Sequence, residues 1–426
     1  MEIQVTRMRD LLDLFKPVVP KKSSIKSTAY ICFREGKAMA TDLETMITAS
    51  CPEATGQEPL LLPFASLSEM LKYVPGTEML QIAIDNKMAK LTWHDGNASY
   101  PVEDPKDFPI PSPDLKASAE GDLDGDTLVP AMLAALPYTA TETTRPVLNG
   151  ISLTLGNPVE VDAADGFRLA HQVLGLSFPV EEKVVIPAKA VSIIGHIFAK
   201  TPREPSASDS LIKAITARRS LHVGLIDGKI KVDFGKAYSV LARLAEGTFP
   251  NILQLLPKGE PILQSQVFAP QFEAAVRRLK GVAKDGKGII RLDFANDTIK
   301  LSATGDDQEV SATLNTINSQ GGPHSVGLDV KYLLEYFSKK EGIVIISRYD
   351  DSGPVSFQYQ KSPRVLVMPM LLGEPPKPAE QEKTEPEAEA SLEEKADETD
   401  QTSAAEEEAA EAEQEAGENE PETVTP

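Results

Sequence analysis

Side chains that could hold a metal ion or move protons are few in this chain. Its five histidines show no metal-ligand spacing with one another; they are His94, His171, His196, His222 and His324. The segment GDLDGD, with Asp122, Asp124 and Asp126, is similar to a calcium loop, but its glycine is misplaced and Leu133 stands where a bidentate glutamate is required. We therefore expect no metal site and interpret this segment as a turn in a linker between domains.

A catalytic constellation is not evident either. Asp165 and Arg168 could act as an acid and its electrostatic partner, but neither a nucleophile nor a base stands beside them. The sequence contains no Walker loop and no Gly-x-Gly-x-x-Gly segment. These patterns weigh against an enzyme and predict a protein that works by binding, without a cofactor.

Charge is distributed unevenly along the 426 residues. The formal net charge is −21, but residues 371–426 carry 20 acidic and 3 basic side chains and contribute −17 of it. This tail has no aromatic residue and too little apolar surface to offset the entropy lost on ordering, so we expect it to be disordered. It serves either as a solubilising extension or as a partner site or repulsive brush.

The remaining composition is that of a globular protein. The hydrophobic fraction is 41%, and no apolar run reaches the roughly 18 residues that a membrane-spanning helix requires. The first ten residues, MEIQVTRMRD, lack the apolar stretch of a signal peptide. The two cysteines, Cys32 and Cys51, are interpreted as small buried hydrophobes. We expect a soluble, cytoplasmic, multi-domain protein.

Three signals recur in order along residues 1–372. A strand ending in small residues and an acid occurs at Ala40-Thr41-Asp42, Ala163-Ala164-Asp165 and Ala303-Thr304-Gly305-Asp306. An apolar strand running into a helix occurs at 60–74, 184–198 and 325–339. A Phe-Pro pair occurs at Phe108-Pro109 and Phe249-Pro250. The offsets between these signals place an insertion of about 17 residues in the second repeat, near 201–220.

Each repeat also opens with apolar residues spaced for one buried helical face. They are Met8, Leu11, Leu12 and Phe15, then Met132, Leu133 and Leu136, then Phe272, Val276 and Leu279. Turns such as 34–37 and 227–229 separate alternating or β-branched stretches, which predicts antiparallel hairpins. We expect each repeat to be α+β, with two helices packed against sheet.

Short segments of the second repeat resemble the middle domain of the bacterial DNA polymerase III beta subunit family. They are TRPVLNG at 144–150 and ADGFRL at 164–169. Further similar segments are ATDLE at 40–44, GTFP at 247–250 and VMPM at 367–370. Each motif is short, but their order and spacing make the resemblance specific over residues 1 to about 372.

The resemblance implies three repeated clamp domains, at 1–122, 123–257 and 258–372, followed by the acidic tail at 373–426. It implies a head-to-tail homodimer closed into a ring, with helices lining a central hole and antiparallel sheets outside. The implied function is that of a DNA sliding clamp, a non-catalytic processivity factor that encircles duplex DNA. Its implied partners are the replicative polymerase, an ATP-driven clamp loader, repair polymerases and mismatch-repair proteins.

A protein that slides on DNA needs diffuse positive charge that contacts phosphates and not base edges. On the six predicted helices we count twelve cations against five anions, a net charge of +7. The cations are Arg7, Arg9, Lys16, Lys72, Lys189, Lys200, Arg277, Arg278, Lys280, Lys331, Lys339 and Lys340. We expect them to face DNA, although any one of them could simply occupy a solvated helix face.

The resemblance also implies a pocket in which partner proteins dock a short apolar peptide. It maps by position to Leu148, Gly166, Phe167, Arg168, Leu169, Pro250, Gln254, Leu255, Leu366, Met368, Pro369 and Met370. Methionine, leucine and proline form an adaptable apolar surface suited to leucine or phenylalanine anchors. For residues 368–370 the alternative is ordinary packing at a strand end.

The chain departs from the family pattern at three positions of this pocket. The family commonly has a basic residue at Gln254, an arginine at Leu371 and a threonine at Ala164. The polar rim and the peptide preference are therefore expected to differ. These departures keep open a second function, an interaction scaffold with the clamp fold that is not loaded on DNA.

Overall fold

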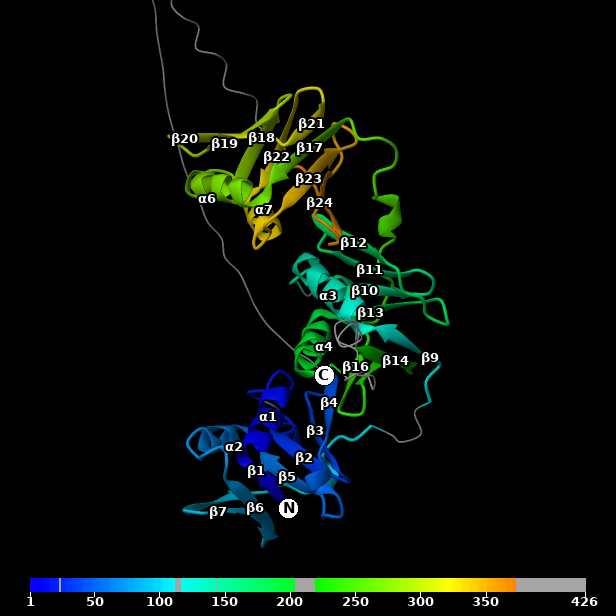
Figure 1. Cartoon of the computed structure of the whole chain (residues 1–426), viewed down its shortest axis with the longest axis vertical. Coiled ribbons are helices and arrows are strands. Elements are labelled where there is room, and N and C mark those ends of the chain that lie inside the picture. The colour runs from blue at the N-terminus through cyan, green and yellow to red at the C-terminus, as the bar shows by residue number, and fades with distance from the viewer. Residues whose placement is uncertain (23, 112–115, 143, 204–218, 373–426) are drawn as a thin grey trace, which may run out of the picture. The chain divides into compact units, whose positions relative to one another are not determined.

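The same order of elements occurs three times along the chain (Figure 1): a strand, a helix, four strands, a second helix and three strands. The third copy contains one extra strand. The computed structural model describes residues 1–22, 24–111, 116–142, 144–203 and 219–372, and these contain six α-helices and 25 strands. The expected disorder at 373–426 and most of the expected insertion at 201–220 lie outside the described residues.

We name the three copies the first, second and third repeat. The first has β1 (Glu2–Gln4), α1 (Val5–Phe15), β2 (Tyr30–Arg34), β3 (Lys37–Thr41), β4 (Thr45–Ser50), β5 (Leu60–Pro63), α2 (Phe64–Leu71), β6 (Met79–Asp85), β7 (Met88–Trp93) and β8 (Gly96–Pro101). The second has β9 (Ala119–Asp124), α3 (Gly125–Ala135), β10 (Gly150–Leu155), β11 (Val159–Ala164), β12 (Arg168–Leu174), β13 (Glu182–Pro187), α4 (Ala188–Lys200), β14 (Ser220–Ile226), β15 (Lys229–Phe234) and β16 (Tyr238–Arg243). The third has β17 (Leu263–Phe268), α6 (Ala269–Asp285), β18 (Ile289–Phe294), β19 (Thr298–Thr304), β20 (Glu309–Asn315), β21 (Asn318–Gly321), β22 (His324–Asp329), α7 (Val330–Phe337), β23 (Ile343–Arg348), β24 (Val355–Gln358) and β25 (Arg364–Val367).

The predicted hairpin turns are confirmed. Glu35 and Gly36 join β2 to β3 with φ angles of 51° and 73°, and Asp227 and Gly228 join β14 to β15 with φ angles of 42° and 69°. Two-residue turns with positive φ at both positions match the twist of antiparallel strands, which explains the glycine at the second position of each turn.

The recurring acid after a strand also has a structural role. The Asp42 carboxylate follows β3 and accepts hydrogen bonds from the backbone N–H groups of Glu44 and Thr45, at 3.1 and 2.7 Å. The Asp165 carboxylate follows β11 and accepts from Phe167 and Arg168 at 3.0 and 2.9 Å. Such side-chain to backbone bonds fix tight turns, so this repeat signal marks where one strand of a hairpin ends.

The helices pack in pairs within each repeat, α1 beside α2, α3 beside α4, and α6 beside α7 (Figure 1). In the third repeat the rings of Phe272 and Phe337 stack with centroids 4.2 Å apart. The apolar faces predicted for the first and third repeats are buried. In the second, Leu133 is 39% exposed and covers Gly195 of α4, where an added Cβ would lie 2.7 Å from Leu133. Glycine therefore allows α3 and α4 to approach closely.

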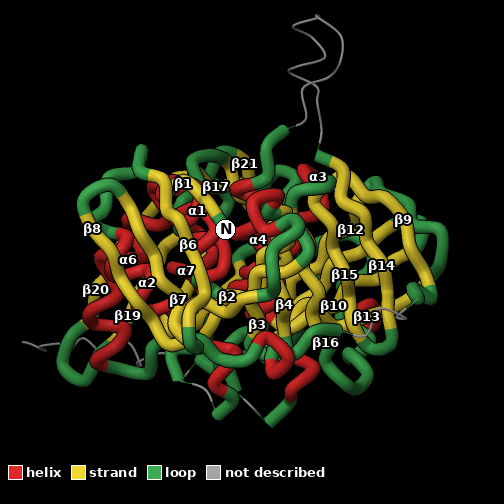
Figure 2. The backbone as a smooth tube through the Cα atoms, turned by 90° about the horizontal axis from the view of Figure 1, so that it is seen from below, coloured by secondary structure: helices red, strands yellow, loops and turns green. Residues whose placement is uncertain are grey.

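Adjacent repeats share continuous antiparallel sheets. β4 of the first repeat pairs with β16 of the second in an eight-stranded sheet, and β12 of the second pairs with β25 of the third in a nine-stranded sheet. Two four-stranded sheets remain, β1-β6-β7-β8 and β20-β19-β18-β22. Figure 2 shows β6, β7 and β8 side by side at the left of the view. In the described part of the chain, β8 and β20 each have one unpaired edge.

The interpretation of GDLDGD as a linker turn is wrong. Its residues form the end of β9, which pairs with β14, and the start of α3. Asp124 is the N-cap residue of α3, where its carboxylate accepts from the hydroxyl of Thr127 at 2.6 Å. Aspartate at an N-cap position satisfies otherwise unpaired helix N–H groups, which explains an acid there without calcium. The expected domain boundary after Asp122 falls inside β9.

Both cysteines are buried and unpaired, as predicted. Burial raises the pKa of the Cys32 thiol to about 11 and that of Cys51 to about 12, so both are protonated at neutral pH. None of the helices in residues 1–372 that the structure describes has the length and apolar character needed to cross a membrane.

Candidate functional site

The described helices carry less positive charge than expected. Within their observed bounds they hold nine basic and seven acidic side chains, a net charge of +2 and not +7. α1, α2 and α7 end before four of the expected cations, which are Lys16, Lys72, Lys339 and Lys340. Asp126 and Asp285 lie inside α3 and α6, beyond the helix limits expected from the sequence.

Three of the twelve expected cations bind main-chain carbonyls of the protein itself. Arg9 donates to the carbonyl of Leu71 at 2.8 Å, at the C-terminal end of α2, and Arg7 donates to a carbonyl at the end of β4. Lys340 donates to the carbonyl of Tyr336, and its ammonium lies 4.2 Å from the centroid of that ring. Burial lowers the pKa of Lys340. These side chains stabilise the fold, and their charge is not free for a ligand.

Four others form ion pairs with acids. The pairs are Lys72 with Glu69, Arg277 with Glu273, Lys189 with Asp42 and Lys200 with Asp13. The last two join α4 of the second repeat to the first repeat, and the hydrogen bond from Lys200 lowers the pKa of Asp13. These pairs partly neutralise the positive charge of the helix surface.

The remaining five make no ion pair within the described residues. They are Lys16, Arg278, Lys280, Lys331 and Lys339. α6 presents Arg278 and Lys280 together with Lys284, an exposed cation that sequence reasoning missed because it did not extend this helix to Asp285. Among the described helices, α6 therefore has the most basic residues.

A small buried apolar cluster, separate from the main core, lies at the base of the predicted partner pocket. It contains Leu148, Leu169, Val185, Phe249, Ile252 and Leu366. Pairing of β12 with β25 sets Leu169 opposite Leu366, so the second and third repeats both contribute. The structure thus brings together three predicted pocket residues, Leu148, Leu169 and Leu366, although each is at most 6% exposed.

Around this cluster, four predicted pocket residues form an exposed apolar rim: Phe167, Leu255, Met368 and Met370. Phe167 is 63% exposed, Leu255 59% and Met368 46%. Gly166 has a φ of +96°, a conformation that favours glycine, and this turn presents Phe167 to solvent. The backbone N–H of Met368 donates to the carbonyl of Phe167 at 2.8 Å, so the two side chains come from adjacent segments. Pro250, Gln254, Pro369 and Met370 are also at least partly exposed.

Arg168 is not part of an open rim. Its side chain is 6% exposed and donates to Asp165 at 2.8 Å, to Glu335 of α7 at 2.5 Å and to the carbonyl of Pro137 at 2.7 Å. The guanidinium also lies 4.4 Å from the ring centroid of Tyr332. Arg168 therefore ties the β11–β12 hairpin of the second repeat to α7 of the third.

A cavity of 720 Å³ adjoins this network. Its lining includes Leu148, Gly166, Phe167 and Arg168 from the predicted pocket, together with Lys331, Tyr332 and Glu335 of α7. Lys331, expected to face DNA, lines this cavity. Tyr332 and Glu335 were missed as pocket residues, since nothing in the sequence indicates that α7 packs against the 165–168 turn. Phe167 belongs to the exposed apolar rim and also lines the cavity.

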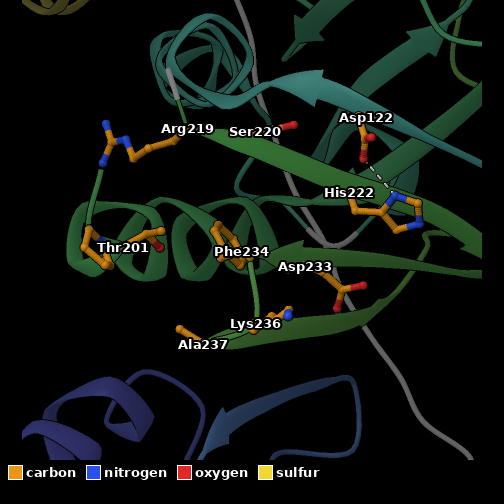
Figure 3. Close-up of a pocket in the computed structure, with 11 residues that line it drawn as sticks. Asp122, Thr201, Arg219, Ser220, His222, Asp233, Phe234, Lys236 and Ala237 are labelled. Carbon is orange, nitrogen blue, oxygen red and sulfur yellow. Dashed lines mark hydrogen bonds and ion pairs between the residues drawn. The ribbon is translucent and has the colours of Figure 1, made fainter. Parts of the chain in front are cut away.

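A second cavity, of 280 Å³, lies beside β14 and β15 (Figure 3). Nδ1 of His222 lies 2.9 Å from the Asp122 carboxylate, and Nε2 lies 3.7 Å from Glu120. The hydrogen bond to Asp122 raises the pKa of His222. The sequence could not show this pair, because the two residues are brought together only by the pairing of β9 with β14.

Replacing Asp122 by asparagine is expected to lower the pKa of His222 toward the ordinary histidine value. Because the pKa is raised in the folded state, the pair stabilises the fold below the ordinary pKa, and this contribution is lost as pH rises through the raised pKa. NMR titration of the His222 ring protons measures the shift, with His94 as the internal control. An unchanged His222 midpoint in D122N would contradict the assignment.

Three comparisons relate this chain to known proteins. Residues 137–251 match the family described as DNA polymerase III beta subunit, central domain. A beta sliding clamp of Staphylococcus epidermidis is 24% identical over 380 residues, covering 82% of this chain and 94% of that protein. A beta sliding clamp of Staphylococcus aureus is 22% identical over 378 residues, with the same shares covered.

Solved structures resemble the fold over most of its length. The DNA polymerase III subunit beta of Pseudomonas aeruginosa superimposes with a TM-score of 0.76 at 19% identity, over 87% of this chain and 100% of that chain. The beta subunit of Thermotoga maritima gives a TM-score of 0.75 at 17% identity, over 87% and 99%. The predicted α+β clamp architecture is therefore confirmed.

Proposed function

Because residues 137–251 match the central domain of the DNA polymerase III beta subunit family and a beta sliding clamp aligns with 82% of the chain, we propose that the chain is a DNA sliding clamp. It is a non-catalytic processivity factor of the replicative polymerase, which closes into a ring around duplex DNA and slides without reading sequence. Its partners are DNA, a second copy of itself and polymerases, and its place of action is the cytoplasm, where bacterial chromosomal DNA lies.

The pairing of sheet edges is the observation that carries this proposal. β4, β12 and β20 occupy equivalent positions in the three repeats, as do β8, β16 and β25. β4 pairs with β16 and β12 pairs with β25, which leaves β20 and β8 as the matching edges within the described residues. If β20 of one copy pairs with β8 of another, the contact between copies has the same form as the β4–β16 and β12–β25 junctions within the chain. Such head-to-tail contacts close into a ring when the rotation from one copy to the next adds up to a full turn.

We propose three domains that follow the repeats. The second ends near Pro257 and the third at residue 372, as expected from the sequence. The first boundary is moved to before Ala119, so that β9 stays with the α3 helix that follows it. In this division each domain opens with one strand and one helix.

Ring assembly is tested by sedimentation velocity on the full chain at micromolar concentration. A closed homodimer has twice the mass of 46.1 kDa that one chain has. A single species at that mass supports the ring, whereas monomers, or a ladder of growing head-to-tail polymers, would contradict it.

The DNA-facing surface is proposed to centre on α6. Replacing Arg278 and Lys284 together by alanine is expected to weaken binding to short linear duplexes of every sequence alike. The slope of log affinity against log salt concentration should become shallower by about 0.9 for each phosphate that the variant no longer neutralises. Fluorescence anisotropy at several salt concentrations measures both quantities.

The matched control for this experiment is Lys300→Ala, which removes an exposed lysine from β19 of the same repeat. Its salt dependence should equal that of the unaltered protein. If Lys300→Ala weakened DNA binding as much as the double variant on α6, then DNA binding would not be directed to the helices.

We propose that the partner pocket combines the exposed apolar rim with the adjoining cavity at Phe167. The ligand is a short segment with leucine or phenylalanine anchors, carried by the polymerase, the clamp loader or repair and mismatch-repair proteins. Exposed apolar side chains around a buried cluster suit such a peptide. Gln254 and Leu371 offer no charge, so the peptide needs no acidic group opposite them.

A second function, the clamp-fold scaffold that is not loaded on DNA, is favoured by one observation. The described helices carry a net charge of +2, well below the +7 expected for a DNA channel. The scaffold and the clamp differ in whether the protein stays on circular DNA after a loader has acted, and only the clamp should do so.

A further inference from the structure

Three potential metal ligands lie together on the β11–β12 hairpin. Their ligand atoms, from Glu160, Asp162 and His171, all lie within 4.8 Å of one another. The expectation of no metal site was based on the spacing among the histidines and on the misfit of residues 121–126 to a calcium loop. This group combines a single histidine with two carboxylates, so neither pattern could indicate it. None of these residues belongs to the proposed DNA surface or the partner pocket.

The strand register explains why these residues meet. Asp162 of β11 is directly opposite His171 of β12, and Glu160 lies two residues before Asp162. Residues two apart on a strand, and residues opposite one another across strands, have side chains on the same face. Nδ1 of His171 lies 2.7 Å from the Asp162 carboxylate, and Asp162 is 2% exposed. The group is therefore built into the sheet.

A buried hydroxyl lies beside the group on the same sheet. Ser152 of β10 is directly opposite Asp162 on its other side, so its side chain is on the same face. It is 0% exposed, and its Oγ has no hydrogen-bond partner among the described residues. Leaving a buried hydroxyl unsatisfied costs about 1–3 kcal/mol, so a ligand at this place would be stabilised by it.

We propose that Glu160, Asp162 and His171 bind a divalent transition-metal ion, best matched by Zn²⁺, with Ser152 or water at the fourth position. One imidazole and two carboxylates form a donor set that suits zinc, and the two carboxylates balance its charge. Ligand atoms about 2.0–2.2 Å from one ion lie at most about 4.4 Å apart, so small side-chain movements complete the site. This proposal does not depend on the sliding-clamp function.

Binding here would reinforce a junction of the fold. β12 also pairs with β25 of the third repeat, with His171 opposite Arg364. The hairpin turn between β11 and β12 presents Phe167. An ion that joins the two strands would therefore stabilise both the junction between repeats and the base of this turn.

The chain contains a natural control for this site. Glu120, Asp122 and His222 repeat the same arrangement, with two acids two residues apart on β9 and a histidine opposite the second acid on β14. Here Asp122 lies near Nδ1 of His222 and Glu120 lies near its Nε2, so the two carboxylates are on opposite sides of the imidazole ring. One ion cannot be bound by all three groups, and the histidine side chain is 45% exposed.

The test is calorimetric titration of the metal-free full chain with ZnCl₂, together with thermal unfolding with and without the ion. We expect one equivalent to bind and to raise the unfolding midpoint. Glu160→Gln, which leaves the His171–Asp162 pair intact, should weaken binding at least about 10-fold, while His222→Ala should bind like the unaltered protein. When Co²⁺ replaces Zn²⁺, the visible absorption spectrum of the bound ion should indicate low-symmetry coordination by nitrogen and oxygen ligands.

Two results would overturn the proposal. One is the absence of stoichiometric zinc binding by the unaltered chain. The other is zinc binding that is unchanged in both Glu160→Gln and His171→Ala. Circular dichroism of each metal-free variant separates a defect in binding from a defect in folding, and neither result bears on whether the protein is a clamp.

Discussion

Replacing Arg168 by alanine is expected to destabilise the protein by about 3–5 kcal/mol, the usual cost of removing one member of a buried ion pair. The Arg168 side chain is 6% exposed and contacts the carboxylates of Asp165 and Glu335 as well as the carbonyl of Pro137. Its removal leaves Asp165, itself 13% exposed, without its cation. Urea unfolding followed by circular dichroism measures the destabilisation as a lower midpoint.

Arg243→Ala is the matched control. Arg243 also lies near two carboxylates, those of Glu246 and Glu44, but its side chain is 54% exposed. Its removal should cost at most about 0.5 kcal/mol. Equal midpoints for R168A and R243A would show that Arg168 does not join the repeats. Glu335→Gln added to R168A should recover part of the stability, because one uncompensated charge is removed.

Truncating the exposed apolar rim is expected to weaken peptide binding strongly while leaving stability almost unchanged. Phe167→Ala, or Met368→Ala with Met370→Ala, should cost about 2 kcal/mol of binding free energy, roughly 30-fold in affinity, as buried anchors of an interface do. The side chains are 63%, 46% and 37% exposed in the free protein, so they contribute little packing within the chain. Calorimetry with a ten-residue peptide that carries leucine and phenylalanine anchors measures the change.

Ile84→Ala serves as the control for this prediction, because Ile84 is an apolar residue of β6 with 46% exposure and lies in the first repeat. It should bind the peptide with unchanged affinity. If the rim variants also bound the peptide normally, the pocket would have to be placed elsewhere on the surface.

Local patterns predicted much of the fold. The turns at Gly36 and Gly228, the strand that ends before Asp165 and the buried faces of α1 and α6 all depend on neighbours a few residues away. Periodicity and turn chemistry report such contacts directly. The threefold repeat could be found for the same reason, since each copy carries the same local signals.

Contacts across strands and between repeats could not be predicted in this way. Nothing near Arg168 in the sequence indicates that Glu335 binds it, and nothing near Asp162 indicates that His171 lies opposite. The expected excess of helix charge was wrong for a related reason. The sequence pattern predicts Lys340 to be a helix cation, but it lies beyond the end of α7 and packs against Tyr336. Segment boundaries and tertiary packing decide whether a charge reaches a ligand.

Topological encirclement of DNA is the central claim, and retention on circular DNA tests it most directly. The purified full chain is loaded by a clamp loader onto nicked circular DNA, moved to high salt and then exposed to a nuclease that linearises the circle. A closed ring should remain on intact circles, because salt screens charges but does not open a ring, and should leave once ends are present. Dissociation from intact circles at high salt would contradict encirclement and leave only electrostatic binding.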